Sequence, residues 1–463
     1  MRRMKRAAPA VVAMLVAAGA AAPAAGAASR PSLPKCPIGA IAKLPAAKKP
    51  VQITMWNAQR NVAPLRQLAD QFNGSQSDVK VNVVDLPNYD VALQKFLSGL
   101  STGDLPDVAM MQEIDLQKAI DTAAMLPAQS CANAEKYSFR DHVKRIVDYF
   151  TVGGVLWPMP FNTSTPLFYY DKHDFETAGL DPTKPPVTLD DLEADAKKLK
   201  AAGIATPFVF KVDGWYLEHW FAKAGVLYAN NRNGRRSRAT SVLFDNRVGR
   251  SIFRFLQRMQ RQGLAKGVDH NSWDNLFAIG NGNASMTIDT SAALGTIQQV
   301  LGSGGGSDKQ LQFGVGRMPS PRGPGSVVVG GGSIYLVRKG RSAAQQEGAW
   351  RWAKFLNEAK SQAAWSAATG YLPVRRSAVQ MPEVQAAWAK SPGYRIAYEQ
   401  LLAGANTDAT AGPVVGPYTE VRDAVNGQMA EILDKGKAPT TALTDAAAKA
   451  NSIIAEYNDR LGQ

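Results

Sequence analysis

The stretch from Val51 to Met111 alternates between strand-like and helix-like hydrophobic patterns, and this alternation restricts the fold more than any other feature. The segments Val51 to Trp56, Val79 to Leu86 and Asp107 to Met111 are short apolar runs typical of buried strands. Between them, apolar residues fall on one face of a helix: Val62, Leu65, Leu68 and Phe72, and then Leu93, Phe96, Leu97 and Leu100. Strand, helix and strand in this order form βαβ units, so the chain predicts an α/β fold in which helices cover a parallel sheet.

The length of the chain indicates more than one folding unit. At 463 residues it exceeds the usual size of a single hydrophobic core, so two or three units are expected. Hydrophobic residues make up 45% and charged residues 20%, which are ordinary values for soluble globular proteins. No later segment has a run of about 18 apolar residues, so we expect no membrane-spanning helix in the mature chain.

The N-terminal 27 residues have the pattern of a secretory signal peptide. Four Arg and Lys residues within the first six positions precede an Ala-rich apolar run, and Ala25-Gly26-Ala27 is a small-residue cleavage site. We therefore expect an exported protein, periplasmic or extracellular and associated with the cell surface. Residues 28–50 are rich in Ala, Pro and Lys, which predicts an exposed leader before ordered structure begins at Val51.

Two cysteines, Cys36 and Cys131, remain after cleavage of the signal peptide. Because exported proteins meet an oxidising environment, we predict a disulfide between them. Two alternatives stay open: both thiols are free, or Cys36 carries a lipid. The second alternative is weakened by Arg30-Pro31-Ser32-Leu33-Pro34-Lys35, which precedes Cys36 where an apolar recognition sequence would be needed.

Charge and composition exclude several kinds of site. The formal net charge of +14 falls to +10 without the signal peptide, and the densest basic run, Arg232 to Arg238, has Gly and Asn turn formers and no aromatic residues. This run predicts a solvated loop and no nucleic-acid site. The histidines show no metal-ligand spacing: His142, His173, His219 and His270. We expect no metal, no cofactor and no catalytic motif.

A polar cluster joins an aromatic strand between Pro160 and Asp171. Asn162 to Thr165 offer short hydrogen-bonding side chains, and Phe168 to Tyr170 favour an extended backbone. This join indicates a crossing between two lobes beside a ligand; an ordinary core strand after a turn is the alternative. Trp215, next to Gly214 at a predicted helix start, is either a ligand contact or a core residue.

The sequence resembles the solute-binding proteins of bacterial ABC importers, family 1, carbohydrate type, and among them the glycerol-3-phosphate-binding members. The resemblance extends from about Val51 to the C-terminus. It is carried by Pro160-Phe161-Asn162-Thr163-Ser164-Thr165-Pro166, Tyr169-Tyr170-Asp171-Lys172, Ala178-Gly179-Leu180-Asp181-Pro182, Gly330-Gly331-Gly332-Ser333 and Thr369-Gly370-Tyr371-Leu372-Pro373. It implies a periplasmic-binding-protein type II-like fold, with two α/β lobes joined by three hinge crossings around a ligand cleft.

The same resemblance implies the lobe boundaries and the ligand contacts. Lobe 1 is expected at 51–160 plus 285–337, and lobe 2 at 161–284 plus 338–463. The family's ligand-contacting residues match Tyr89, Glu113, Ser164, Ser291, Gly331 and Tyr371, and Trp215 lies where the family stacks tryptophans on its ligand. One position departs: the family's phosphate-binding arginine corresponds to Val414. Three nearby arginines are candidate substitutes: Arg375, Arg376 and Arg422.

We therefore predict a monomeric binding protein that captures a sugar, polyol, glycerol phosphate or glycerophosphodiester and delivers it to the permease subunits of an ABC importer. Because Val414 replaces a charged residue, the neutral or diester ligand is favoured over the phosphate monoester. Two other classes stay open. One is a secreted carbohydrate-active enzyme using Glu113 with Glu218 or Asp289, since that chemistry needs two placed carboxylates. The other is a sensor subunit that reports ligand occupancy to a receptor.

Overall fold

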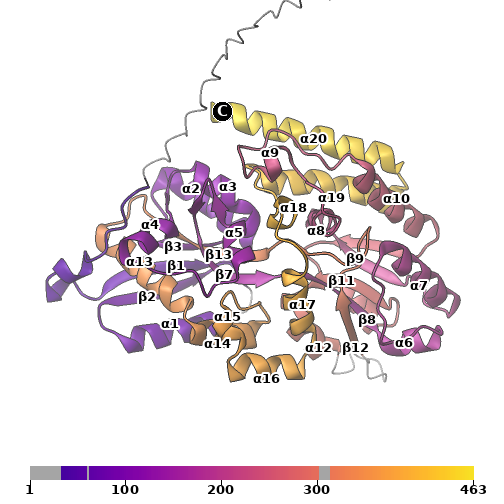
Figure 1. The fold of residues 1–463 in the computed structure, drawn as a ribbon, viewed down its shortest axis with the longest axis horizontal. Helices are drawn as coiled ribbons and strands as arrows, with labels where there is room; N and C mark the ends of the chain where they lie inside the picture. Colours follow the sequence, from indigo (N-terminus) through magenta and orange to yellow (C-terminus); the bar gives the residue numbers. More distant parts are fainter. Residues whose placement is uncertain (1–32, 60–61, 302–312, 463) are drawn as a thin grey trace, which may run out of the picture. The chain divides into compact units, whose positions relative to one another are not determined.

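The computed structural model describes residues 33–59, 62–301 and 313–462. The signal peptide predicted for residues 1–27 lies outside the described residues. Contacts along the chain separate Met1–Leu33 from Pro34–Gln463, and every element named below belongs to the second part (Figure 1).

The first sheet has the strand order β2-β1-β3-β13-β4, and β7 pairs with β13 beside this path. Its strands are β1 (Val51–Asn57), β2 (Val79–Asp85), β3 (Val108–Gln112), β4 (Met125–Leu126), β7 (Met159–Ser164) and β13 (Gly330–Val337). The pairs β1–β2 and β1–β3 are parallel, which confirms the predicted βαβ units. Strand β13 runs antiparallel to β3, β4 and β7.

The second sheet has the order β10-β9-β11-β8-β12. Its strands are β8 (Pro166–Asp171), β9 (Phe208–Val212), β10 (Ala265–Asp269), β11 (Met286–Thr290) and β12 (Phe313–Arg317). Strand β9 is parallel to β10 and β11, whereas β8 is antiparallel to β11 and β12. A short hairpin of β5 (Thr151–Val152) and β6 (Val155–Leu156) forms a third sheet. Two mixed sheets with helices confirm the predicted two-lobed α/β class.

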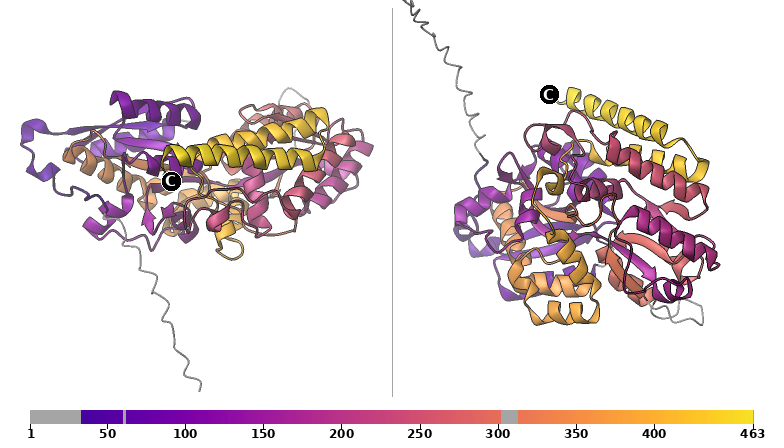
Figure 2. Two further views of the ribbon diagram at one scale, coloured as in Figure 1. Left: turned by 90° about the horizontal axis from the view of Figure 1, so that it is seen from above. Right: turned by 45° about the vertical axis from the view of Figure 1, so that its right-hand side comes forward.

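Helices lie between the strands in the sequence and pack against the two sheets. In chain order the α-helices are α1 (Ala63–Ser75), α2 (Tyr89–Thr102), α3 (Leu116–Asp121), α4 (Ala128–Glu135), α5 (Lys144–Tyr149), α6 (Lys172–Thr177), α7 (Leu189–Ala201), α8 (Gly214–Lys223), α9 (Asn230–Asn233), α10 (Arg247–Arg261), α11 (Asp274–Gly280), α12 (Leu294–Leu301), α13 (Ala343–Leu356), α14 (Ala359–Thr369), α15 (Arg376–Val379), α16 (Pro382–Lys390), α17 (Gly393–Leu402), α18 (Asp408–Ala411), α19 (Tyr418–Lys435) and α20 (Pro439–Arg460). The 3-10 helices are η1 (Ile41–Lys43), η2 (Ala46–Lys48), η3 (Glu113–Asp115) and η4 (Ser291–Ala293). Helices α10, α19 and α20 pack together beside the second sheet, as Figures 1 and 2 show.

The chain passes between the sheets three times. It leaves the first sheet after β7 and enters the second at β8, so the first crossing falls at Thr165. It returns between β12 and β13, across residues 318–329. The third passage lies at Ser391 and Pro392, because α16 packs on α14 and α15 while α17 packs on β8 and β12.

In three segments the division of the chain between the two sheets differs from the expected lobe boundaries. The segment 285–337 was expected in lobe 1, but β11 and β12 lie in the second sheet because both pair with its strands, and only β13 belongs to the first. Residues 161–164 were expected in lobe 2, but they are the end of β7 in the first sheet. The expected lobe 2 segment 338–463 is also divided, since α13 packs on β1 and β13 of the first sheet.

The described part of the leader expected at residues 28–50 is packed against the first sheet's helices and is not simply exposed. Ile41 is completely buried, and its backbone N–H donates to Glu347 Oε2 at 2.8 Å. This contact anchors η1 against α13 of the first sheet. The Ala, Pro and Lys content of this segment predicts exposure, and it gave no indication that one isoleucine, Ile41, is buried and attaches the segment to α13.

The predicted disulfide between Cys36 and Cys131 is confirmed. Cys131 is completely buried in α4, so the bond attaches the segment before β1 to the helices of the first sheet. The alternatives of two free thiols or a lipid on Cys36 are therefore excluded by this structure.

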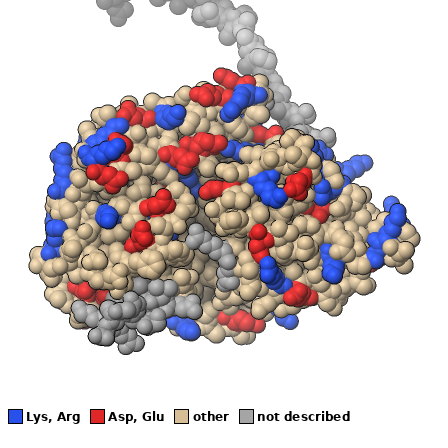
Figure 3. Space-filling model, turned by 180° about the vertical axis from the view of Figure 1, so that it is seen from behind, with Lys and Arg blue, Asp and Glu red and all other residues tan. Residues whose placement is uncertain are grey.

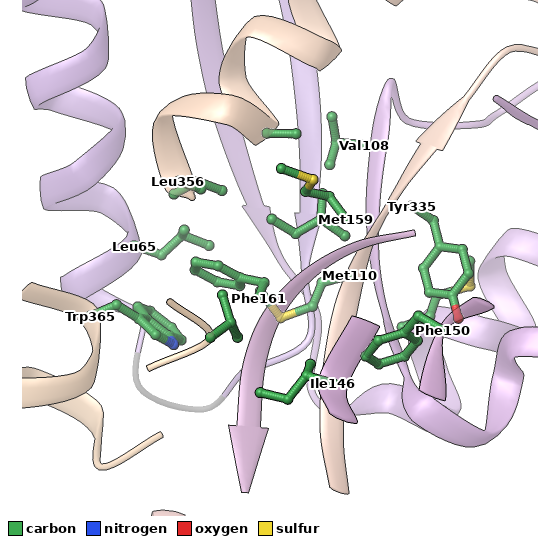
Figure 4. Close-up of a cluster of buried hydrophobic side chains, with 14 of the residues drawn as sticks. Leu65, Val108, Met110, Ile146, Phe150, Met159, Phe161, Tyr335, Leu356 and Trp365 are labelled. Atoms are coloured by element: carbon green, nitrogen blue, oxygen red, sulfur yellow. The ribbon is translucent and has the colours of Figure 1, made fainter. Parts of the chain in front are cut away.

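The structure has two hydrophobic cores, and the first contains Phe161 of β7 together with Leu167 and Tyr169 of β8. In β7 the Phe161 ring packs against the Trp365 ring at 4.8 Å between centroids. Figure 4 shows Phe161 among Leu65 and Met159, beside Trp365. Strand β8 lies between the two cores, because Leu167 and Tyr169 face the first core while Phe168 and Tyr170 face the second.

Candidate functional site

A cavity of about 850 Å³ is lined by residues from both sheets and their helices. On one side are the end of β1, the start of α2 and helix α14; on the other are the ends of β9 and β11 and the loop 270–273 after β10. Ligands of open α/β sheets bind beyond the carboxyl ends of strands, which is where these residues lie. The volume is in the upper part of the usual range for small-molecule sites.

Two tyrosines of the cavity, Tyr89 and Tyr371, are joined through Gln59. The Tyr371 hydroxyl donates to Gln59 Oε1 at 2.7 Å, and the Gln59 amide donates to the Tyr89 hydroxyl. The Tyr89 hydroxyl also accepts from Asn162 Nδ2 at 2.8 Å. Burial raises the pKa of Tyr371 to about 12 and that of Tyr89 well above its ordinary value, so both are neutral phenols.

An aromatic face extends this network along the cavity wall. The rings of Tyr371 and Trp365 stack at 6.1 Å with an interplanar angle of 13°. Trp273 lines the cavity from the second sheet's side, with Lys211 Nζ at 5.1 Å from its ring centroid. Rings of this kind pack well on the carbon faces of sugars and polyols.

A charged pair lies in the same wall. Lys211 Nζ is 3.1 Å from Asp289 Oδ2, and Asn275 Nδ2 donates to the same oxygen at 2.9 Å. Asp289 is 2% exposed, so its charge is held inside the protein by these partners. The lysine is therefore compensated where it borders the cavity.

Glu113 belongs to a buried ion-pair network. Arg422 Nη2 is 2.8 Å from Glu113 Oε1, and the same guanidinium bonds Glu218 through Nε at 2.6 Å and Nη2 at 2.8 Å. Glu113 follows β3 of the first sheet, whereas Glu218 on α8 and Arg422 on α19 lie beside the second. Burial raises the pKa of Glu113 to about 7, although the charge of Arg422 opposes this shift.

Further polar contacts, which we call the α3 clasp, connect α3 to elements beside the second sheet. Lys118 Nζ is 2.7 Å from Glu420 Oε1 of α19. Arg238 Nη2 is 2.6 Å from Asp121 Oδ1, and the Tyr457 hydroxyl of α20 donates to Asp121 Oδ2 at 2.8 Å. Together with Glu113 and its arginine, the clasp holds the two halves together along one side.

Three predicted contacts, Ser164, Ser291 and Gly331, lie at the crossing between the sheets. Ser291 is fully buried, and its Oγ accepts from the Thr165 backbone N–H at 3.2 Å. Gly331 has φ +101°, and a Cβ there would lie 2.2 Å from the Asn162 carbonyl oxygen, so only glycine fits this backbone. Ser164, 3% exposed, ends β7 opposite Gly330.

Trp215 lies against the same crossing. A Cβ on Gly330 would be 2.6 Å from the Trp215 ring, so the indole packs directly on this backbone. Its ring also meets His219 edge-on at 4.6 Å, and it is 9% exposed. The structure thus brings Tyr89 and Tyr371 into the cavity wall, whereas Trp215 and the other four predicted contacts lie behind it.

The arginines proposed to replace the missing phosphate ligand have different partners. Arg375 bonds Asp141 at 2.7 Å and the Asn357 carbonyl at 3.0 Å, and Arg376 donates to the Arg140 carbonyl. Of these candidates, Arg422 contacts a predicted site residue, Glu113. Val414 itself is buried and donates its backbone N–H to Asn233.

Sequence reasoning missed several residues of the cavity: Gln59, Lys211, Trp273, Asp289 as a wall residue, and Trp365. Three of these residues could have been found from their positions in the sequence, because Gln59, Lys211 and Asp289 lie at or just after the ends of strands, where ligands of such sheets bind. The strands are β1, β9 and β11. Trp273 and Trp365 carry no such signal, since tryptophans near helices are usually core residues.

Within the described residues, no group of His, Cys, Asp and Glu could hold a metal ion. None of the described helices is long and apolar enough to cross a membrane. On the face in Figure 3, basic and acidic side chains are interspersed, so neither sign of charge dominates there.

Comparison with known proteins defines the family. Residues 67–392 match the family model of the bacterial extracellular solute-binding proteins. The sn-glycerol-3-phosphate-binding periplasmic protein UgpB of Pectobacterium atrosepticum is 27% identical over 424 residues, covering 89% of this chain and 93% of that protein. UgpB of Escherichia coli O1:K1 is 26% identical over 428 residues, covering 90% and 95%.

Solved structures share the fold at low identity. UgpB of Mycobacterium tuberculosis in complex with glycerophosphocholine has a TM-score of 0.74 at 20% identity, covering 89% of this chain and 99% of that chain. The sugar-binding protein MalE of Xanthomonas citri has a TM-score of 0.73 at 17% identity, covering 89% and 100%. The expected periplasmic-binding-protein fold is confirmed. The chain belongs to the bacterial extracellular solute-binding protein family.

Proposed function

We propose that this protein captures a sugar, polyol, glycerol phosphate or glycerophosphodiester in the cavity between its lobes and delivers it to the permease of an ABC importer. It acts as a monomer outside the cytoplasmic membrane, after export by its signal peptide. The observation that carries the proposal is the cavity of about 850 Å³, whose wall combines hydrogen-bonding groups with stacked rings. The relatives named for glycerol-3-phosphate or sugar binding support this ligand class.

The sheets and crossings support a two-lobed arrangement. The first lobe comprises residues 34–164 and 330–390, and the second comprises 166–317 and 393–462. The hinge then lies at Thr165, within 318–329 and at 391–392. Ligand contacts to both lobes favour the closed state over the open one, so binding shifts the population toward closure.

The seven predicted contacts divide between two roles. Tyr89 and Tyr371 contact the ligand with their rings and hydroxyls, since both line the cavity. Glu113 accepts hydrogen bonds from ligand hydroxyls once the lobes rearrange around them. The remaining four lie within or against the crossing, where their backbone or side-chain groups meet the ligand at the base of the cleft: Ser164, Trp215, Ser291 and Gly331.

Tyr371→Ala is expected to weaken the best ligand at least tenfold, because it removes a hydroxyl donor and a ring that covers Trp365. Titration calorimetry against disaccharides, glycerol, glycerol-3-phosphate and glycerophosphodiesters first identifies that ligand in the wild-type protein. Tyr89→Ala is expected to behave in the same way. Tyr137→Phe, which alters a half-buried tyrosine outside the cavity, is the matched control and leaves the affinity unchanged.

Two results would contradict the proposal. If both alanine variants fold normally and retain wild-type affinity, the cavity is not the ligand site. If the wild-type protein hydrolyses a chromogenic glycoside or phosphodiester and Glu113→Gln abolishes turnover, the protein is an enzyme. The geometry of the two carboxylates argues against catalysis, because Glu113 and Glu218 both bond Arg422 and do not face a common substrate bond.

A further inference from the structure

We infer that Arg422, held between Glu113 and Glu218, decides the charge of the ligand: the site accepts uncharged hydroxyl donors and rejects phosphate groups. This inference rests on the proposed function and makes it more specific. The sequence leaves open whether Arg422 replaces the phosphate-binding arginine missing at Val414. The contacts of Arg422 show that it does not offer a free positive charge.

Arg422 is compensated within its own lobe. Its Nε and Nη2 groups bond the two oxygens of Glu218 at 2.6 and 2.8 Å, which is the bidentate geometry of a strong arginine–carboxylate pair. Both residues lie beside the second sheet, on α19 and α8. The pair therefore persists when the lobes separate, so the open cleft does not expose a bare guanidinium either.

Glu113 adds a second carboxylate from the other lobe. When all three groups are ionised, the one arginine and two carboxylates carry a formal charge of −1, and because burial raises the pKa of Glu113 to about 7, the charge of the network at neutral pH lies between −1 and zero. Each residue is at most 6% exposed. A phosphate brought to this position meets no free positive charge and, where Glu113 is ionised, a net negative charge in a poorly solvated interior, where repulsion is stronger than in water. A phosphodiester is also repelled, because its phosphate keeps one negative charge, but less strongly than a monoester, whose second ionisation adds further negative charge at neutral pH.

The network leaves one hydrogen-bond acceptor, Glu113 Oε2, without a partner among the described residues. Glu113 Oε2 is buried and receives no hydrogen bond from the described residues, whereas Oε1 receives one from Arg422. A ligand hydroxyl can donate to this oxygen, while the oxygens of an ionised phosphate carry no proton to donate. An unpaired buried carboxylate oxygen is costly, so a hydroxyl that reaches it is strongly favoured.

The cations of the cavity wall lead to the same conclusion. Lys211 is paired with Asp289 at 3.1 Å, so its charge is already neutralised. Lys390 also lines the cavity but is exposed, and an exposed ammonium adds little to the binding of an anion.

Calorimetry with a small set of probes tests the inference. The probes are maltose, trehalose and glycerol as neutral ligands, and glycerol-3-phosphate, glycerophosphocholine and inorganic phosphate as phosphate ligands. We expect the wild-type protein to bind a neutral probe and to bind each phosphate probe at least tenfold more weakly. Inorganic phosphate at 10 mM, on the order of ten thousand times a micromolar Kd, is expected neither to compete with the neutral probe nor to change its affinity.

Glu218→Gln keeps the size of the side chain and removes one negative charge, which leaves Arg422 with Glu113 alone. We expect this variant to bind glycerol-3-phosphate at least tenfold more tightly than the wild type does. Glu113→Gln removes the other carboxylate and serves if Glu218→Gln does not fold; it is expected to gain phosphate binding and to lose affinity for the neutral probe. Glu193→Gln is the matched control, because Glu193 pairs with Arg258 outside the cavity.

The outcomes separate this inference from the proposed function. Wild-type binding of a phosphate probe as tight as that of any neutral probe overturns the inference and leaves the proposed function standing. Folded variants with no gain in phosphate affinity also overturn it. Wild-type protein that binds none of the six probes contradicts the proposed function and the inference together.

Discussion

Arg422→Ala is expected to lower the free energy of unfolding by about 3–5 kcal/mol, because it leaves two buried carboxylates without their shared partner. Glu113 and Glu218 are 2% and 3% exposed, so water cannot replace the guanidinium. Chemical denaturation at neutral pH measures the loss. We expect the loss to grow as the pH rises, because the folded variant then holds protons that the unfolded chain releases.

Two further variants define the control. Arg66 pairs with Asp85 at the surface, where its side chain is 58% exposed, so Arg66→Ala is expected to cost about 0–1 kcal/mol. A triple variant, Glu113→Gln with Glu218→Gln and Arg422→Met, removes all three charges at similar volume and is expected to recover most of the lost stability. If Arg422→Ala costs no more than Arg66→Ala, the network is not the buried, tightly paired group described here.

Loss of the disulfide is expected to lower the free energy of unfolding by about 2–5 kcal/mol, because the bond between Cys36 and Cys131 closes a long loop in the unfolded chain. The two cysteines are 95 residues apart. Denaturation of the wild-type protein with and without a thiol reductant measures the effect without any change of sequence. The Cys36→Ala and Cys131→Ala double variant is the control and should match the reduced protein. An unchanged midpoint on reduction, with both thiols shown to be free, would contradict this expectation.

The class of fold could be predicted because it rests on local patterns. The alternation from Val51 to Met111 reports strands and helices directly, and both parallel pairs of β1 follow from it. Sheet membership could not be predicted in the same way. Strands β11 and β12 are apolar enough for either sheet, and their place is decided by antiparallel pairing with β8. Such pairing depends on which distant strand is available.

In the candidate site, too, some residues could be predicted from the sequence, whereas their contacts with distant residues could not. Tyr89 and Tyr371 came from a family resemblance, and the structure joins them through Gln59, to which no local pattern pointed. The network of Glu113, Glu218 and Arg422 needs three elements that are distant in the sequence, so its geometry follows only from the packing of α19 against α8 and η3.

The α3 clasp is expected to make ligand binding sensitive to ionic strength, whether or not the ligand itself is charged. Its pairs Lys118–Glu420 and Arg238–Asp121 connect the two halves, and Glu420 is 49% exposed, so dissolved ions reach part of the clasp. Dissolved salt screens these charges and weakens the attraction between the two halves. We therefore expect the affinity of the protein for even an uncharged ligand to fall as the ionic strength of the medium rises.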